Sequence, residues 1–131
     1  MGLIYLDACI LIYAVEDQGT RGASVRRAFR AADAPLATSA LILPECLPGP
    51  LRAQDHALRD RYLAVFERLE IIELGTQSYL RAAQLRAGFG LKTPDAIHLA
   101  AAQLAGCTQF WTNDRRLAAA SNGLAVDIIG G

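Results

Sequence analysis

The feature that most constrains the fold of this chain is the alternation of short apolar segments with longer segments of helical periodicity. Strands are predicted at residues 2–6, 35–39, 70–74, 108–113 and 124–129. Helices are predicted at 8–16, 20–32, 40–47, 54–68, 76–90 and 93–106, and a short one begins at 114. This alternation is typical of a parallel sheet. We therefore expect an α/β fold, with a central parallel sheet of about four to five strands flanked by helices on both faces.

The length and composition indicate a single small domain of the reducing cytoplasm. At 131 residues the chain has room for one domain, which we place at residues 1–131. Its formal net charge is zero, so it lacks the overall basic charge typical of nucleic-acid-binding domains. The three cysteines form no CxxC pair, which argues against disulfides and a zinc ribbon. With no apolar run of roughly 18 residues and no basic leader, we expect a cytoplasmic protein without a membrane partner.

Prolines set the expected boundaries of the helices in the middle of the chain. Pro44 interrupts the segment 40–47, and we expect the regular helix to begin close to it, because a first helical turn tolerates proline. The segment LPGP, residues 47–50, is expected to break the chain. We expect Thr93 to cap the helix 93–106, with Pro94 at its first position.

Four acidic residues lie where a parallel sheet gathers its functional groups. Asp7 directly follows the first predicted strand, and Asp114 directly follows the strand at 108–113. Asp95 lies in the first turn of a helix, and Glu45 lies near the start of another. Taken alone, Asp95 or Asp114 is explained more simply as an acid that the helix dipole favours. The functional interpretation depends on the combination, because ligands bind at the carboxyl ends of parallel strands.

Four carboxylates that converge on one pocket indicate a divalent cation. They would repel one another and raise some of their pKa values, and a cation removes this cost. Ligands that are all oxygen suit Mg²⁺ or Mn²⁺ better than zinc. Such an ion can polarise a phosphodiester and generate hydroxide from water.

Four sequence blocks resemble the PIN domains, and among them the VapC-type toxin ribonucleases of toxin–antitoxin pairs. The resemblance runs nearly end to end, and each block contains one of the four acids. The blocks are YLDACILIY (5–13), TSALILPECL (38–47), LKTPDAIHLAAA (91–102) and FWTNDRRL (110–117). Two departures stand out: Cys9 replaces the serine or asparagine often found there, and Pro44 directly precedes the second acid.

The resemblance implies a metal-dependent endoribonuclease. Asp7, Glu45, Asp95 and Asp114 would be the catalytic residues and the ligands of Mg²⁺ or Mn²⁺, which activates a water for attack on an RNA phosphodiester. The expected products carry a 5′-phosphate and a 3′-hydroxyl. The implied partners are an RNA substrate, a VapB-like antitoxin and a second copy of the chain in a homodimer.

Several neighbours of the four acids are candidates for supporting roles. Thr112, Asn113 and Cys9 are expected to orient the acids or the groups that surround a metal. Arg115, Arg116 and Thr93 are candidates for contact with RNA phosphates. His98 lies one helical turn after Asp95, and we interpret it as a hydrogen-bonded packing residue. Solvated charge remains an equally simple explanation for the arginines.

Three other functions fit parts of the same pattern. A DNA nuclease is disfavoured, because 131 residues leave little room for elements that clamp a duplex. A phosphoaspartate enzyme would need a second acid near Asp7 and a suitably placed lysine, whereas Lys92 is the only lysine. The main alternative is a non-catalytic PIN-like module that binds RNA or a protein, and metal-dependent thermal stabilisation would distinguish it from the nuclease.

Overall fold

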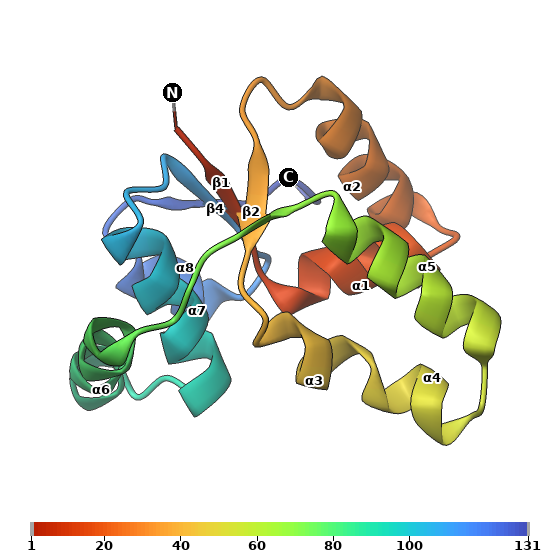
Figure 1. The fold of residues 1–131 in the computed structure, drawn as a ribbon. Helices are drawn as coiled ribbons and strands as arrows, with labels where there is room; N and C mark the ends of the chain where they lie inside the picture. Colours follow the sequence, from red (N-terminus) through yellow and green to blue (C-terminus); the bar gives the residue numbers. More distant parts are fainter. Residues whose placement is uncertain (1, 131) are drawn as a thin grey trace.

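The centre of the structure is a five-stranded parallel sheet (Figure 1). The structure is a computed structural model that describes residues 2–130, so the expected domain 1–131 extends one residue beyond it at each end. The strands are β1 (Ile4–Leu6), β2 (Leu36–Thr38), β3 (Glu70–Ile71), β4 (Gln109–Trp111) and β5 (Ala125–Val126), in the order β3-β2-β1-β4-β5. Every pairing between them is parallel. The expected α/β class is confirmed.

Helices cover both faces of the sheet. Within residues 2–130 they are α1 (Ala8–Glu16), α2 (Thr20–Ala31), α3 (Ile42–Cys46), α4 (Pro48–Arg52), α5 (His56–Glu67), α6 (Thr76–Phe89), α7 (Thr93–Leu104) and α8 (Arg115–Ala120). In Figure 1, α1, α2 and α5 lie on one side of the strands, and α6, α7 and α8 lie on the other. None of the helices in the described range is long and apolar enough to cross a membrane.

Alternate side chains of the central strand β1 enter two different cores, as the two-residue period of a strand requires. Ile4 and Leu6 pack with side chains of α1 and α2, together with Trp111 of β4. Tyr5 points to the opposite face, where it packs with Phe110 and the alanine-rich helix α7. Strand β1 is therefore buried on both faces, which explains why its sequence is continuously apolar up to Asp7.

The parallel register brings the ends of the three central strands to one edge of the sheet. Leu6, the last residue of β1, pairs with Trp111, the last residue of β4. The residues that follow the strands are polar and buried: Asp7 after β1, Ser39 after β2 and Thr112 after β4. This edge is where the sequence predicts the functional groups.

Two local predictions were wrong. The segment LPGP does not break the chain, because Pro48 and Pro50 lie in the first turn of α4. The backbone N–H groups of a first turn have no partner within the helix, so proline loses no hydrogen bond there. Thr93 does not cap α7: Lys92 takes the extended conformation of the N-cap position, and Thr93 is the first helical residue.

Candidate functional site

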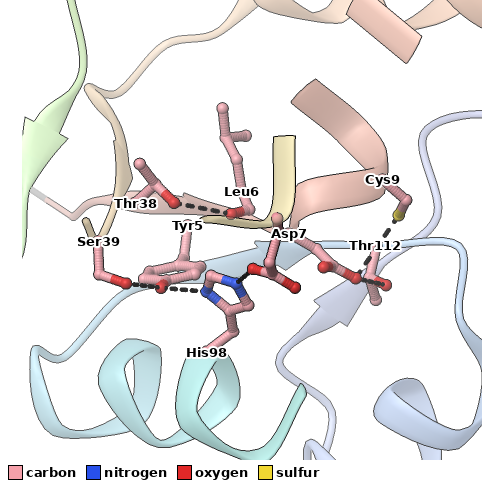
Figure 2. A network of polar contacts seen from close by, with 9 residues as sticks. Tyr5, Leu6, Asp7, Cys9, Thr38, Ser39, His98 and Thr112 are labelled. Carbon is pink, nitrogen blue, oxygen red and sulfur yellow. Dashed lines mark hydrogen bonds and ion pairs between the residues drawn. The ribbon is translucent and has the colours of Figure 1, made fainter. Parts of the chain in front are cut away.

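Asp7 is a buried carboxylate at the carboxyl end of β1. Its backbone N–H donates to the carbonyl oxygen of Trp111 at 3.1 Å, which holds the residue at the edge of the sheet. It occupies the N-cap position of α1, yet its side chain makes no capping hydrogen bond. Oδ2 instead accepts a hydrogen bond from Thr112 Oγ1 at 2.6 Å (Figure 2). The side chain is only 5 % exposed, so helix capping does not account for a carboxylate at this position.

Thr112 connects Asp7 with Asp114. Its hydroxyl donates to Asp7 and accepts a hydrogen bond from the backbone N–H of Asp114 at 3.0 Å. Asp114 also caps α8, because its Oδ1 accepts from the backbone N–H groups of Arg116 at 2.8 Å and Leu117 at 3.4 Å. Asp114 therefore caps α8 and also lies near Asp7.

Cys9 and Asn113 lie beside the first acid. Cys9 Sγ is 3.5 Å from Asp7 Oδ2 and 3.4 Å from Asn113 Oδ1. Burial, together with the charge of Asp7, raises the pKa of the Cys9 thiol to about 12. The thiol is therefore protonated at neutral pH, and its one hydrogen can serve one of these two oxygens at a time.

Glu45 reaches the site from the short helix α3. Pro44 lies within the first turn of this helix, so it does not interrupt it. The carboxylate Oε1 of Glu45 contacts Nε2 of His98, which projects from α7 and is fully buried. The prediction that His98 is a hydrogen-bonded packing residue is confirmed by its burial and its contact with Tyr5, and the imidazole also leans toward the site through its contact with Glu45.

The carboxyl group of Asp95 lies close enough to the other three acids for their charges to act on it. Burial raises the pKa of this carboxyl above its ordinary value, and the charges of Asp7, Asp114 and Glu45 raise it further. These carboxylates come from four segments that are far apart in the chain. Their charges nevertheless act on Asp95, because the ends of β1 and β4 and the starts of α3 and α7 share one edge of the sheet.

The donor chemistry of this cluster fits Mg²⁺ or Mn²⁺. The four acids supply only oxygen atoms, which hard divalent cations prefer, and Asp95 is destabilised by like charges that a cation would neutralise. Within residues 2–130, no three His, Cys, Asp or Glu side chains are arranged closely enough to hold a metal as they stand. Without a cation, mutual repulsion disfavours a closer approach of the four carboxylates. In addition, His98 holds Glu45, and the backbone of α8 holds Asp114.

Cationic side chains line a cavity next to two of the acids. The cavity has a volume of about 330 Å³, and its wall includes Asp95 and Asp114 together with Lys92, Arg115 and Arg116. The two arginines therefore lie beside two of the four acids.

Two further observations qualify the sequence prediction around this cavity. Sequence reasoning missed Lys92, although it is the only lysine and directly precedes the block that contains Asp95. Thr93 is exposed and does not line the cavity, so the structure does not bring it to the acids.

Comparison with protein families assigns the chain to a known family. The PIN domain family model matches residues 4–123. The chain belongs to the PIN domain family, as the resemblance of its sequence blocks implied. A comparison with curated proteins found no match.

Solved structures of similar fold include components of toxin–antitoxin complexes. A chain of a toxin–antitoxin complex from Klebsiella pneumoniae is 25% identical with a TM-score of 0.78, and the match covers 95% of this chain and 96% of that chain. A chain of VapBC2 from Rickettsia felis, bound to a DNA fragment from its promoter, is 17% identical with a TM-score of 0.76 over 95% and 97%. PAE2754 from Pyrobaculum aerophilum is 19% identical with a TM-score of 0.73 over 97% and 91%. The last two share the fold.

Proposed function

We propose that this chain is a Mg²⁺- or Mn²⁺-dependent endoribonuclease, the toxin of a VapBC-type toxin–antitoxin pair. The observation that carries the proposal is the placement of the acids at one edge of the sheet, where Thr112 joins Asp7 to Asp114 and where Asp95 and Asp114 line one cavity. Membership of the PIN domain family supports the nuclease. The similarity to a chain of the Klebsiella pneumoniae complex supports the role as a toxin. We take residues 1–131 as the nuclease domain.

The four acids would hold the cation and orient the attacking water. When bound, the cation supplies positive charge that activates water and stabilises charge on the phosphate. One of the carboxylates of Asp7, Glu45, Asp95 and Asp114 would orient the water and accept its proton. The water oxygen would then attack phosphorus in line, the bond from phosphorus to the 3′ oxygen would break, and the 3′ oxygen would take a proton from the solvent. The fragments carry a 5′-phosphate and a 3′-hydroxyl.

The residues around the acids would position these carboxylates and the RNA strand. Thr112 fixes one oxygen of Asp7 by its hydrogen bond at 2.6 Å. Cys9 lies against the same carboxylate and also against Asn113, so Cys9 would limit the rotation of the carboxylate. Arg115 and Arg116 would hold phosphates at the cavity beside Asp95, because arginine matches the geometry of phosphate oxygens.

A groove next to Glu45 suits a side chain of a VapB-like antitoxin. The groove has a volume of about 360 Å³ and lies between α1, α3, α4 and α5. Ile12 and Leu58 give it apolar walls, and Glu45 and Asp55 make it acidic. A partner that presents an arginine or lysine on an apolar segment would satisfy both features and would block the second acid.

We propose that the toxin forms a homodimer in the cytoplasm. The apolar side chains of Leu51, Tyr79, Leu80 and Phe89 are more than half exposed, and the burial of such side chains favours association. Cys9, Cys46 and Cys107 are free thiols, which suits a reducing compartment. Light scattering at micromolar concentration measures the dimer directly.

The deciding experiment is the cleavage of a mixed set of structured RNAs by the purified protein. The reactions contain Mn²⁺, Mg²⁺ or EDTA, and a DNA of matched sequence serves as the substrate control. Wild-type protein and the variant Asp7→Asn are compared with Asp33→Asn, which changes an exposed aspartate that precedes β2, at the opposite end of the strand from the edge with the acids. We expect metal-dependent cleavage of RNA by wild type and by Asp33→Asn, and none by Asp7→Asn.

Three outcomes would contradict the proposal. Cleavage that survives EDTA or Asp7→Asn would exclude the four acids as the catalytic centre. The absence of both cleavage and metal-dependent stabilisation would favour the non-catalytic binding module, because a bound cation raises the stability of the native state by mass action. Cleavage of the DNA alone would change the substrate class.

A further inference from the structure

We infer that His98 is a positioning residue that orients Glu45 for the cation, and that Tyr5 and Ser39 hold His98 in place. This inference rests on the proposed function, because it assigns a role toward the same metal. The three residues form a buried chain of polar contacts that ends at the second acid (Figure 2).

The imidazole of His98 has a polar partner on each of its two nitrogens. Nε2 contacts Glu45 Oε1, and Nδ1 lies 2.6 Å from Tyr5 Oη. The side chain of His98 is completely buried, whereas that of Glu45 is 23% exposed. An ionised carboxylate only accepts hydrogen bonds, so Nε2 donates to Glu45. The histidine therefore sits on the protein side of the carboxylate and leaves its other side open.

The orientation of the imidazole of His98 is fixed on the side away from Glu45. Tyr5 Oη donates a hydrogen bond to Ser39 Oγ at 3.0 Å, and both side chains are fully buried. The tyrosine ring packs edge-on against His98 at 5.6 Å between centroids and is stacked on Phe110 at 5.5 Å. The hydroxyl that meets Nδ1 is therefore held by β1, by the residue after β2 and by β4, which are central to the sheet.

The helix that carries Glu45 does not by itself fix the carboxylate. Helix α3 has five residues, and a glutamate side chain is among those that lose the most rotamer entropy when they are ordered. The contact with His98 provides this order before a cation binds. Two of the other acids need no such aid from a histidine, since Asp7 and Asp114 have their own hydrogen bonds from Thr112 and α8.

The same logic applies to ligands in metalloproteins generally. Hydrogen-bond partners behind metal ligands set the orientation of those ligands, and their loss typically costs about 10–100-fold in metal affinity. We expect a loss in this range when the donor to Glu45 is removed. A smaller loss is expected when the hydroxyl behind His98 is removed, because the imidazole then retains its packing.

The test measures the affinity for Mn²⁺ alone, from the spin-resonance signal of the free ion in a titration without RNA. His98→Leu removes the donor, and His98→Gln restores an N–H near the position of Nε2. Tyr5→Phe keeps the ring and deletes only the hydroxyl. Tyr62→Phe is the matched control, because it deletes a buried tyrosine hydroxyl that donates to Glu16, outside the four acids. Circular dichroism and urea unfolding establish that each variant is folded.

The expected dissociation constants rise about tenfold or more for His98→Leu, severalfold for Tyr5→Phe and by less than twofold for His98→Gln and Tyr62→Phe. Unchanged or tighter binding of Mn²⁺ by folded His98→Leu and Tyr5→Phe would overturn the positioning role. The proposed function would remain intact in that case if the wild type binds Mn²⁺ and Asp7→Asn abolishes this binding. If His98→Leu does not fold, Tyr5→Phe decides the question. If wild type binds no Mn²⁺, both the positioning role and the metal-dependent function fail.

Discussion

The hydrogen bonds of Thr112 make a sharp prediction about the stability of the site. Thr112→Val replaces the hydroxyl by a methyl group of similar size. The change removes the donor to Asp7 Oδ2 at 2.6 Å and the acceptor for the Asp114 N–H at 3.0 Å. Both groups lie at the carboxyl edge of the sheet, where the side chain of Asp7 is nearly excluded from water. Their loss therefore leaves a buried carboxylate without its strongest donor.

The magnitude follows from the two bonds. A hydrogen bond to a charged group contributes about 1.5–3 kcal/mol, and a neutral one contributes about 0.5–1.5 kcal/mol. Thr112→Val should therefore lower the free energy of unfolding by about 3 kcal/mol. Thr38→Val is the matched control, because Thr38 is also a buried threonine at a strand end and donates one neutral bond to Leu6 O at 3.2 Å. It should cost about 1 kcal/mol.

The assay is urea unfolding in EDTA at neutral pH, followed by circular dichroism. Typical domains have about 5–15 kcal/mol of stability, so both variants should remain folded without denaturant. Equal losses in Thr112→Val and Thr38→Val would refute the reasoning, because the carboxylate would then gain nothing from its donor. A larger loss in Thr38→Val would refute it more strongly.

The remaining predictions concern glycine, pH and salt. Gly22→Ala should lower the free energy of unfolding in urea by several kcal/mol, since the added Cβ would lie 2.0 Å from the carbonyl oxygen of Asp17. Gly88→Ala in α6 is the control: its Cβ meets nothing within 4 Å, and the change should raise the free energy of unfolding by about 0.5–1 kcal/mol. Because the pKa of Asp95 is raised in the native state, the native state binds this proton more tightly than the unfolded chain. In EDTA, stability should therefore fall as pH rises from about 4 through the raised pKa, and Asp95→Asn should remove this fall and be more stable than wild type at neutral pH. Arg116→Gln should reduce the slope of log kcat/KM for RNA against log salt by about 0.7, and an unchanged slope would place Arg116 outside the RNA path.

The sheet and the positions of the four acids could be predicted because their signals are local. Each strand is a short apolar run, because burial on two faces selects apolar side chains, as at Tyr5 and Phe110. An acid that directly ends such a run, like Asp7, can be placed at the carboxyl edge without knowledge of the rest of the fold. Helix α1 was predicted with both of its bounds correct, Ala8–Glu16.

The contacts between segments could not be predicted, because they depend on how the helices dock. The partner of Glu45 is His98, 53 positions later in the chain, and no local pattern links the two. The helix α4 was missed because proline and glycine normally signal a break, and only the position within a first turn makes them harmless. The cavity wall that includes Lys92 likewise depends on the approach of α8 to the start of α7.

The position of β4 beside β1 has a consequence for the order of synthesis. The hydrogen bond from Thr112 to Asp7 joins residues that are 105 positions apart, and β1 is paired on one side by β4. While a ribosome is still making the middle of the chain, the first acid exists but neither its donor nor Asp114 has been added. The set of four acids, together with the hydrogen bond that holds the first of them, is therefore complete only after residue 114 of the 131 has been translated.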